Sequence, residues 1–587
     1  MDTHGPLRTE LIVGVTSHRD LDPAQLPHLR TQVRDAFAML RQHYPDLALV
    51  VVSALAEGGD RLVAEVALDA GARLVVPLPL PVELYSEDFA NAQSQHDFAR
   101  LLVDAETVPL KLVEPDHDVL RTPGPARDRQ YLHAGLFVAN HCHVLFALWD
   151  GREEVGTGGT AQIVRYYLGG PVPGARRATD NLRQMLAGDD DSLVLHFHVR
   201  RNGAAAQPPT THRHQVRPPS AQPQPRRGRR KSLPAGESGE PTWRTSAGQR
   251  SFSAGLPPEY DRIFRRMQGF QRDRVKLDKG ALPAASEDAA ERTWREADAL
   301  AVHFQRCTLW AMRAIHILAV AMGLALLLYS DLGAPDSMLW VFLGLFAVGL
   351  AIALTAHRRD WHRKYIDYRA LAEGLRVQTF WRRAGLTITG DAEFAHDNFM
   401  QKQDVELGWI RNVMRQVGLA RTGPAQDADD AAQAVAEVID AWVGRPGQSG
   451  QLAYYERKSV LRERHHVRTR ALGAACLWAG IGISLVLALF HRGFSDDTRG
   501  LLVTLMGALS LIAAVREAYA YRKADKELIK QYRFMHRIYR NARLALDAAA
   551  STQEKREILR ALGEAALAEH AEWALMHRDR PIEHGRP

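Results

Sequence analysis

The chain has 587 residues, 46% of them hydrophobic and 24% charged, and a formal net charge of +7. This length allows three or four domains, and a mean hydropathy of −0.26 means that any apolar segments are diluted by a large polar portion. Three scattered cysteines, Cys142, Cys307 and Cys476, exclude a disulfide framework and fit a reducing compartment.

The first residues, MDTHGPLRTE, hold no apolar stretch, so we expect no secretory signal. Residues 8–200 then alternate short apolar runs with runs of helical spacing. Apolar strands separated by helices are typical of a mostly parallel sheet covered on both faces. Helices are expected at Leu26–Leu40, Arg61–Asp69 and Ala161–Tyr167. The expected strands are Leu11–Val15, Leu47–Ser53, Leu74–Pro77, Val108–Val113, Val144–Trp149 and Leu193–Val199.

Residues 201–258 are rich in Pro, Arg, Gln, Ser and Gly and contain the basic cluster Arg226–Lys231. Such a composition cannot bury enough apolar surface to fold, so it predicts a disordered, basic, Pro-rich linker. The cluster could contact anionic lipid or nucleic acid, or it could simply be a solvated tether.

Two pairs of apolar segments follow, Ala314–Ser330 with Met338–Ala356 and Ala471–Phe490 with Leu501–Val515. A hydrocarbon core of roughly 30 Å needs about 20 mainly apolar helical residues. We therefore expect an all-α C-terminal half with four transmembrane helices in two hairpins and long cytosolic helices. Residues 259–420 would form the helical module of the first hairpin, and residues 421–587 that of the second.

Charge predicts how the hairpins are oriented. Lysines and arginines flank both pairs, whereas the first loop carries Asp331 and Asp336, and the second carries Arg492, Asp496, Asp497 and Arg499. Because positive charge stays on the cytoplasmic side, both hairpin tips should face outward and both termini should be cytosolic. Much of the basic excess lies beside these segments, so the lipid bilayer is the simplest partner for it.

The two hairpins also share a trailing helix, expected at Asp360–Arg383 and at Glu517–Ala549. Each helix contains a Tyr-Arg pair, Tyr368-Arg369 in the first and Tyr532-Arg533 in the second, followed by Arg376 and by Arg537 or Arg540. This pattern indicates a duplicated module. The alternative is that any helix beside a membrane is basic and aromatic.

Three loops fall at the carboxyl ends of expected strands, which is the edge where open α/β sheets bind ligands. Their small residues, hydroxyls and fixed cations are typical of phosphate sites, and the start of a helix adds N–H donors. Asp60 is expected to cap its helix, and Glu57 to accept from ribose hydroxyls. Plain turns with solvated charges are the alternative. The candidate ligand contacts are Gly14, Thr16, Ser17, His18, Arg19, Ser53, Glu57, Gly58, Gly59, Asp60, Arg61, Trp149, Asp150, Gly156, Thr157, Gly158, Gly159 and Thr160.

Metal binding is not expected. His141-Cys142-His143 resembles a metal cluster, but successive side chains on a strand point to opposite faces, so Cys142 is expected in the core. His196 and His198 share a strand face without an apparent third ligand.

The candidate loops carry a family resemblance. SALAEGGDRLVAEVAL (Ser53–Leu68) resembles the glycine loop and helix of the DprA/SMF and LOG Rossmann-like group, and GTGGTA (Gly156–Ala161) resembles its second glycine loop. With GVTSHRDL (Gly14–Leu21) and LFALWDG (Leu145–Gly151), residues 8–200 resemble the SLOG superfamily. The C-terminal half, with AEWALMHRDRPIE (Ala571–Glu583), is similar to SLATT-type two-helix membrane effectors, here in two copies.

The resemblance implies a Rossmann-like fold and a nucleotide or nucleotide-derived messenger as the ligand. SLOG domains also occur in predicted bacterial defence effectors and in the cytosolic part of melastatin-type TRP channels. LOG-type phosphoribohydrolases carry a glutamate just after Gly-Thr of the second loop, whereas Gly159-Thr160 is followed here by Ala161-Gln162. Hydrolysis thereby loses its best base, so binding without turnover is expected, unless Asp150, Glu153 or Glu154 substitutes.

We therefore expect a ligand-gated membrane effector or channel in the bacterial inner membrane. Its cytosolic domain would sense a nucleotide-derived signal, made by an enzyme encoded nearby, and gate a homo-oligomeric pore such as a tetramer in defence against phage. A membrane-anchored nucleotide-processing enzyme and a metabolite-gated housekeeping channel are the alternatives.

Overall fold

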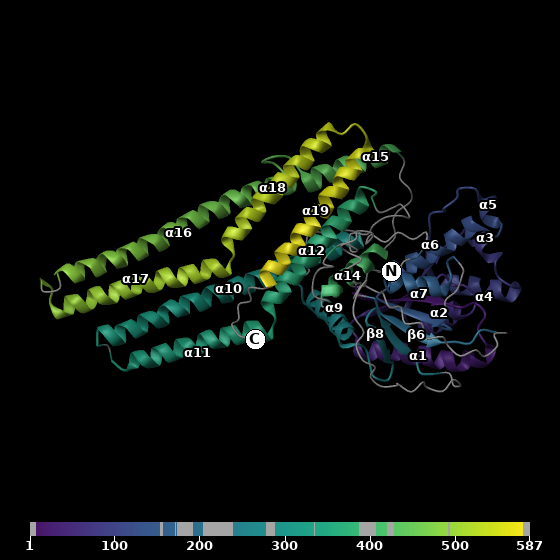
Figure 1. Cartoon of the computed structure of the whole chain (residues 1–587), viewed down its shortest axis with the longest axis horizontal. Coiled ribbons are helices and arrows are strands. Elements are labelled where there is room, and N and C mark those ends of the chain that lie inside the picture. Colours follow the sequence, from purple (N-terminus) through teal and green to yellow (C-terminus); the bar gives the residue numbers. More distant parts are fainter. Residues whose placement is uncertain are drawn as a thin grey trace, which may run out of the picture. The chain divides into compact units, whose positions relative to one another are not determined.

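The computed structural model describes residues 8–152, 157–170, 172, 192–202, 239–277, 288–333, 335–386, 399, 407–419, 428–490 and 493–578. The chain divides into two compact units, which Figure 1 colours along the sequence. The first unit comprises Met1–Val275, Thr389–Glu393 and Asp404–Arg421. The second comprises Lys276–Ile388, Phe394–Gln403 and Thr422–Pro587.

The first unit is an α/β domain built on one eight-stranded sheet, with the order β4-β3-β2-β1-β5-β6-β7-β8. Strands β1 to β6 pair in parallel, which confirms the expected, mostly parallel sheet. Edge strand β4 contains Ala105–Pro109 rather than Val108–Val113, because pairing with β3 begins directly after the preceding helix. The other parallel strands are β1 (Glu10–Ser17), β2 (Ala48–Val52), β3 (Arg73–Leu78), β5 (Val144–Trp149) and β6 (Val194–His198).

Two further strands lie inside the range that the sequence assigns to the linker. β7 (Thr242–Thr245) and β8 (Gly248–Ser251) form an antiparallel hairpin on β6. Trp243 is only 1% exposed and stacks on Phe252, so a single aromatic anchor holds a polar stretch to the sheet. The prediction of a disordered linker is wrong for these two strands. The composition of residues 201–258 is dominated by polar residues, so it conceals the contribution of a single buried tryptophan. Residues 203–238, with Arg226–Lys231, lie outside the described residues.

Helices cover both faces of the sheet (Figure 1). On one face α1 (Leu26–His43) packs through Phe37 on Phe146, beside α2 (Gly59–Asp69). On the other, α6 (Pro125–His141) and α7 (Thr160–Tyr167) complete an apolar cluster with β1, β2 and β5. The remaining elements along the sheet are η1 (Pro23–Gln25), α3 (Val82–Ser86), α4 (Ala92–Val103) and α5 (His117–Arg121).

Two helices that the sequence places in the first helical module belong to this α/β unit. They are α9 (Pro258–Lys276) and α14 (Gly408–Leu419), and Phe270 packs on Trp409 between them. His143 binds this pair to the sheet, since its Nε2 lies 2.9 Å from the Asn412 carbonyl oxygen. The α/β unit therefore includes two helices, α9 and α14, that are far apart in the sequence.

The second unit is helical throughout its described residues, and four of its helices are long and apolar enough to cross a membrane. Between 0 and 17% of each apolar window is buried inside the unit, so most of these side chains face outward. Such exposure is unfavourable in water and expected in lipid. The four are α10 (Ala289–Asp331), α11 (Ser337–Arg358), α16 (Gly450–Phe490) and α17 (Asp496–Arg522). The others are α12 (Trp361–Arg383), α15 (Ala428–Val438), the π-helical turn η4 (Ile439–Val443), α18 (Asp525–Ala548) and α19 (Thr552–Arg578).

The four apolar helices form two hairpins, α10–α11 and α16–α17, which touch through α10 and α17 (Figure 1). Gly323 of α10 faces Leu511 of α17, and Gly507 of α17 faces Leu327 of α10. A Cβ at either glycine would overlap the facing leucine, so these small residues set how closely the helices approach.

The trailing helices begin at matching turns. Asp360, with a φ of 52°, separates α11 from α12, and Ala524, with a φ of 50°, separates α17 from α18. Counted from these two residues, Tyr368-Arg369 and Tyr532-Arg533 occupy equivalent positions, as do Arg376 and Arg540. This shared order supports the duplication that the sequence indicates.

The arginine of each Tyr-Arg pair makes an equivalent contact in its own repeat. Arg369 donates to Asp298 of α10 and Arg533 to Glu463 of α16, both at 2.6 Å. Each trailing helix is thus joined to the long helix of its own hairpin by an equivalent ion pair.

The left-handed turn at Ala524 provides a test. Ala524→Gly should raise the apparent Tm of the full chain in detergent, because glycine avoids a cost of about 1 kcal/mol at positive φ. Ala542→Gly, inside α18, should lower the apparent Tm, because glycine is less favourable than alanine in the interior of a helix. Equal destabilisation by both changes would contradict the assigned turn.

Candidate functional site

The strand order of the α/β unit reverses at β1, which has β2 on one side and β5 on the other. In parallel sheets, loops that follow neighbouring strands diverge at such a point and leave a crevice outside the carboxyl ends. Ser17, the last residue of β1, lies opposite Leu148 near the end of β5. Two of the three loops singled out in the sequence therefore begin side by side.

The first and third loops meet through a close contact between a histidine and an aspartate. His18 Nε2 lies 3.2 Å from Asp150 Oδ1, and the two side chains are 4% and 11% exposed. The His18 N–H also donates to the Leu148 carbonyl oxygen at 3.1 Å. Asp150 accepts from the Arg152 N–H at 3.0 Å, so its carboxylate bridges the end of β5 and the residues just after it.

The first and second loops also touch. Ser17 Oγ donates to Asp60 Oδ1 at 2.6 Å, and the Gly59 N–H donates to the His18 carbonyl oxygen at 3.3 Å. Gly58 has a φ of +84°, and a Cβ there would lie 2.7 Å from the His18 carbonyl oxygen. Gly58 and Gly59 therefore allow the second loop to approach the first loop closely.

The third loop packs its glycine turn against α6. Gly158 has a φ of +82°, and a Cβ there would lie 3.0 Å from the Leu132 nitrogen. Gly159 is the residue before α7, and it has no side chain that could cap the helix. The Gly158 N–H donates to Gln162 Oε1 at 2.5 Å. Thr160 opens the helix and is 6% exposed. Thr157 is exposed, and Gly156 lies outside the described residues.

Arg19 of the first loop places a positive charge near the carboxyl ends of the strands. Its side chain is exposed, and its Cζ lies 5.7 Å from the centre of the Tyr131 ring on α6. Within the described ranges, no hydrogen bond or ion pair engages the Arg19 guanidinium. The three loops and Tyr131 thus surround a region with a fixed positive charge above the strand ends.

Glu57 faces the same edge from the second loop. Its Oε1 accepts from the Ala90 N–H at 2.9 Å and from Ser94 Oγ. Partial burial acts to raise the Glu57 pKa, but these hydrogen bonds and the charges of Arg61 and Arg19 outweigh it and lower the pKa. The carboxylate is therefore ionised and can accept from a ligand hydroxyl through Oε2.

Asp60 does not act as the expected helix cap. Helix α2 begins at Gly59, its cap residue Gly58 makes no side-chain bond, and Asp60 turns toward Ser17. The carboxyl group is 5% exposed. Burial raises its pKa to about 6, although Ser17 and Arg19 oppose the shift. A group with this pKa exchanges a proton near neutral pH.

Several predicted contacts are turned into the protein instead. Arg61 is 8% exposed, donates to the Leu55 and Ser94 carbonyl oxygens and lies 4.3 Å from the centre of the Phe89 ring. Gly14 lies within β1, where a Cβ would come 2.8 Å from Cys142 Cβ.

Three more candidates line the walls of the edge. Ser53 is fully buried, and its Oγ accepts from the Leu55 N–H at 3.2 Å. Trp149 donates from Nε1 to the Arg152 carbonyl oxygen at 2.9 Å. Thr16 lies within β1 next to Ser17 and is partly exposed. These residues shape the loops from within the protein.

Sequence reasoning missed Tyr131. Its hydroxyl donates to Asp88, and Arg127 Nη2 lies 2.5 Å from the other oxygen of the same carboxylate. Nothing in the sequence marks a tyrosine in mid-helix as a neighbour of the candidate loops, since only the packing of α6 against the glycine turn brings it there.

Arg244 of β7 was missed as well. Its Cζ lies 5.6 Å from the centre of the Trp149 ring. Burial, together with the Arg244 charge, lowers the pKa of His196 to about 3. Among the described segments, no group of three or more His, Cys, Asp or Glu side chains could hold a metal ion.

Comparison of the chain with protein-family models, curated proteins and solved structures gave no match.

The buried Asp60 carboxyl predicts a specific pH dependence. Because its folded pKa, about 6, exceeds its ordinary value of 3.8, its contribution to stability is complete below about pH 4 and is lost as the pH rises through 6. From pH 4 to 7, wild type should lose about 2 kcal/mol of unfolding free energy relative to Asp60→Asn. Thermal unfolding of both proteins across this range measures the difference, and parallel curves would contradict the assignment.

The loop-to-loop contact predicts a second effect. Gly58→Ala should destabilise the chain by about 2 kcal/mol or more, because it combines positive φ with a clash against the first loop. Gly248→Ala is the control, since a Cβ there meets nothing within 4 Å. Similar Tm values for the two variants would show that the loops do not meet at Gly58.

Proposed function

We propose that this chain is a membrane-embedded sensor. Its α/β unit binds a nucleotide-derived ligand, and its helical unit assembles with other copies into a pore that the ligand gates. The meeting of three loops where the strand order reverses, with His18 and Asp150 joining the ends of β1 and β5, carries the binding part of this proposal.

Each part of such a ligand has a chemical counterpart at the edge. Arg19 can ion-pair with a phosphate, and the first turns of α2 and α7, which lack side-chain caps, offer backbone N–H groups to phosphate oxygens. Ionised Glu57 can accept hydrogen bonds from ribose hydroxyls. These features support the likeness of residues 8–200 to the SLOG superfamily.

The membrane part rests on the four outward-facing apolar helices. Their basic flanks and the acidic residues at their tips favour cytosolic termini in a bacterial inner membrane. The repeated hairpins resemble SLATT-type effectors, and a role in defence against phage follows from that likeness. A housekeeping channel would have the same architecture.

Gating imposes an energetic requirement. A ligand moves a 1:99 population to 99:1 only if it binds the open state about 5.5 kcal/mol more tightly than the closed state. A hydrogen bond to a charged group contributes about 1.5–3 kcal/mol. Two to four phosphate contacts made in one state only are therefore sufficient.

A second candidate function has its own observation. Asp60, with a pKa near 6 beside Ser17, and the neighbouring His18–Asp150 pair resemble the proton-handling groups of a hydrolase. The chain would then be a membrane-anchored nucleotide-processing enzyme. Sustained nucleotide turnover by the purified chain, abolished by Asp60→Asn, would favour this function over binding alone.

Binding can be tested by calorimetry with the full chain in detergent, using ATP, ADP, AMP and a cyclic dinucleotide as probes. Arg19→Gln should weaken the binding of the best probe at least tenfold, because it removes the positive charge near the strand ends. Gly158→Asp should abolish binding, because it places a carboxylate and a Cβ at the glycine turn.

Arg30→Gln is the matched control. Arg30 lies on α1, where it pairs with Glu65 at 2.7 Å on the outer surface of the domain. This variant should bind like wild type. Unchanged affinity in Arg19→Gln would refute the proposed site, and failure of every probe to bind wild type would refute a nucleotide-type ligand.

A further inference from the structure

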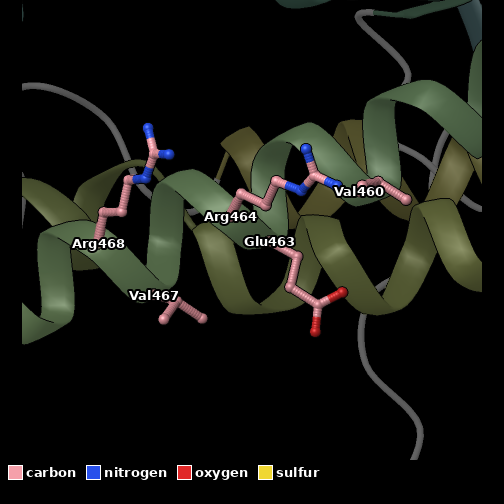
Figure 2. A pocket seen from close by; sticks show the side chains of 5 residues that line it. All are labelled: Val460, Glu463, Arg464, Val467 and Arg468. Carbon is pink, nitrogen blue, oxygen red and sulfur yellow. The ribbon is translucent and has the colours of Figure 1, made fainter.

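An open hollow lies on one face of α16, just before its apolar stretch begins at Ala471. It has a volume of about 400 Å³ and is lined by Val460, Glu463, Arg464, Val467 and Arg468 (Figure 2). Helical spacings of three and four residues bring these side chains to one face. Figure 2 shows Arg464 and Arg468 on one side of this face, and Glu463 and Val467 on the other.

The hollow is cationic. Glu463 accepts from Arg533 of α18 at 2.6 Å, so a basic residue outside the hollow neutralises its charge. Arg464 and Arg468 are exposed, and across the described parts of the chain neither forms an ion pair or hydrogen bond. Two positive charges are therefore available to an anionic group.

The same hollow is partly apolar. Val460 is 43% exposed and Val467 is 59% exposed, although neither lies in the apolar stretch of α16. A free phosphate ion has no apolar part that could pack against these two valines. A phospholipid presents both an anionic headgroup and an apolar portion next to it, which matches a mixed basic and apolar surface.

Depth along α16 agrees with this match. An α-helix rises 1.5 Å per residue, so Arg468 lies about 5 Å and Arg464 about 10 Å before Ala471. The polar headgroup layer extends about 5–7 Å beyond the hydrocarbon on each side. Arg468 and Val467 therefore lie within that layer, and Arg464 lies just beyond it on the cytosolic side. This step rests on α16 crossing a membrane, as in the proposed function, and not on ligand binding by the α/β unit.

The first repeat lacks the two arginines. When Asp298 of α10 is aligned with Glu463, the positions of Arg464 and Arg468 are taken by Ala299 and His303, while Val302 matches Val467. The cationic pair thus belongs to the second hairpin alone.

We propose that this hollow is a binding site for the headgroup of an anionic phospholipid, with Arg464 and Arg468 contacting the phosphate and Val467 contacting the adjoining glycerol carbons. A bound lipid would fix the second hairpin at one depth in the cytosolic leaflet.

The test uses the full chain in a mild, uncharged detergent, titrated with phosphatidylglycerol or with phosphatidylcholine. Native mass spectrometry counts bound lipid, and the shift in Tm reports its effect on the folded protein. We expect phosphatidylglycerol to bind and raise the Tm, and Arg464→Gln/Arg468→Gln to bind it about 100-fold more weakly, since each lost charge-assisted hydrogen bond to the phosphate weakens binding about tenfold.

Arg306→Gln/Arg313→Gln is the matched control, because it removes two exposed arginines before the first apolar segment. It should keep wild-type affinity. Equal loss in both double variants would overturn the proposal in favour of diffuse surface attraction. A full Tm shift with glycerol 3-phosphate would show a soluble anion site instead. Loss of oligomer mass in Arg464→Gln/Arg468→Gln, without lipid dependence, would assign the hollow to a second copy of the chain.

The lipid and nucleotide experiments fail independently. Phosphatidylglycerol binding without nucleotide binding would retain the hollow and refute the sensor, and the converse result would retain the sensor and refute the hollow.

Discussion

The parallel pairing of β1 with β2 on one side and β5 on the other is the constraint on which the α/β unit depends. It makes the loops after β1 and β5 start side by side above the strand ends. The close His18–Asp150 contact joins these two loops at their base. Gly58 can then bring the second loop against the first.

The helical unit depends on a different constraint, the exposure of its apolar helices. The apolar side chains that face outward from α10, α11, α16 and α17 suit a lipid environment, whereas glycines such as Gly323 and Gly507 let α10 and α17 approach closely. Equivalent left-handed turns at Asp360 and Ala524 then redirect each repeat into a charged trailing helix. The second repeat adds Arg464 and Arg468, which give it a surface that the first repeat lacks.

The sequence predicted elements whose signal is local. β5 runs from Val144 to Trp149 as expected, and α7 begins one residue before the expected Ala161, because apolar runs and glycine turns mark strand and helix limits directly. Long-range packing was harder to predict. No local pattern shows that Trp243 anchors a hairpin to the sheet, that Arg61 turns inward onto Phe89, or that Tyr131 of α6 lies beside the candidate loops.

We propose that a ligand held at the β1–β5 edge changes the state of the membrane helices. Ion flux from liposomes that contain the full chain tests it most directly, with the best-binding nucleotide added on the side that exposes the α/β unit. We predict flux that rises with nucleotide occupancy in wild type and is absent in Arg19→Gln at the same protein density. Flux that is independent of nucleotide, or equal in both proteins, would contradict the account.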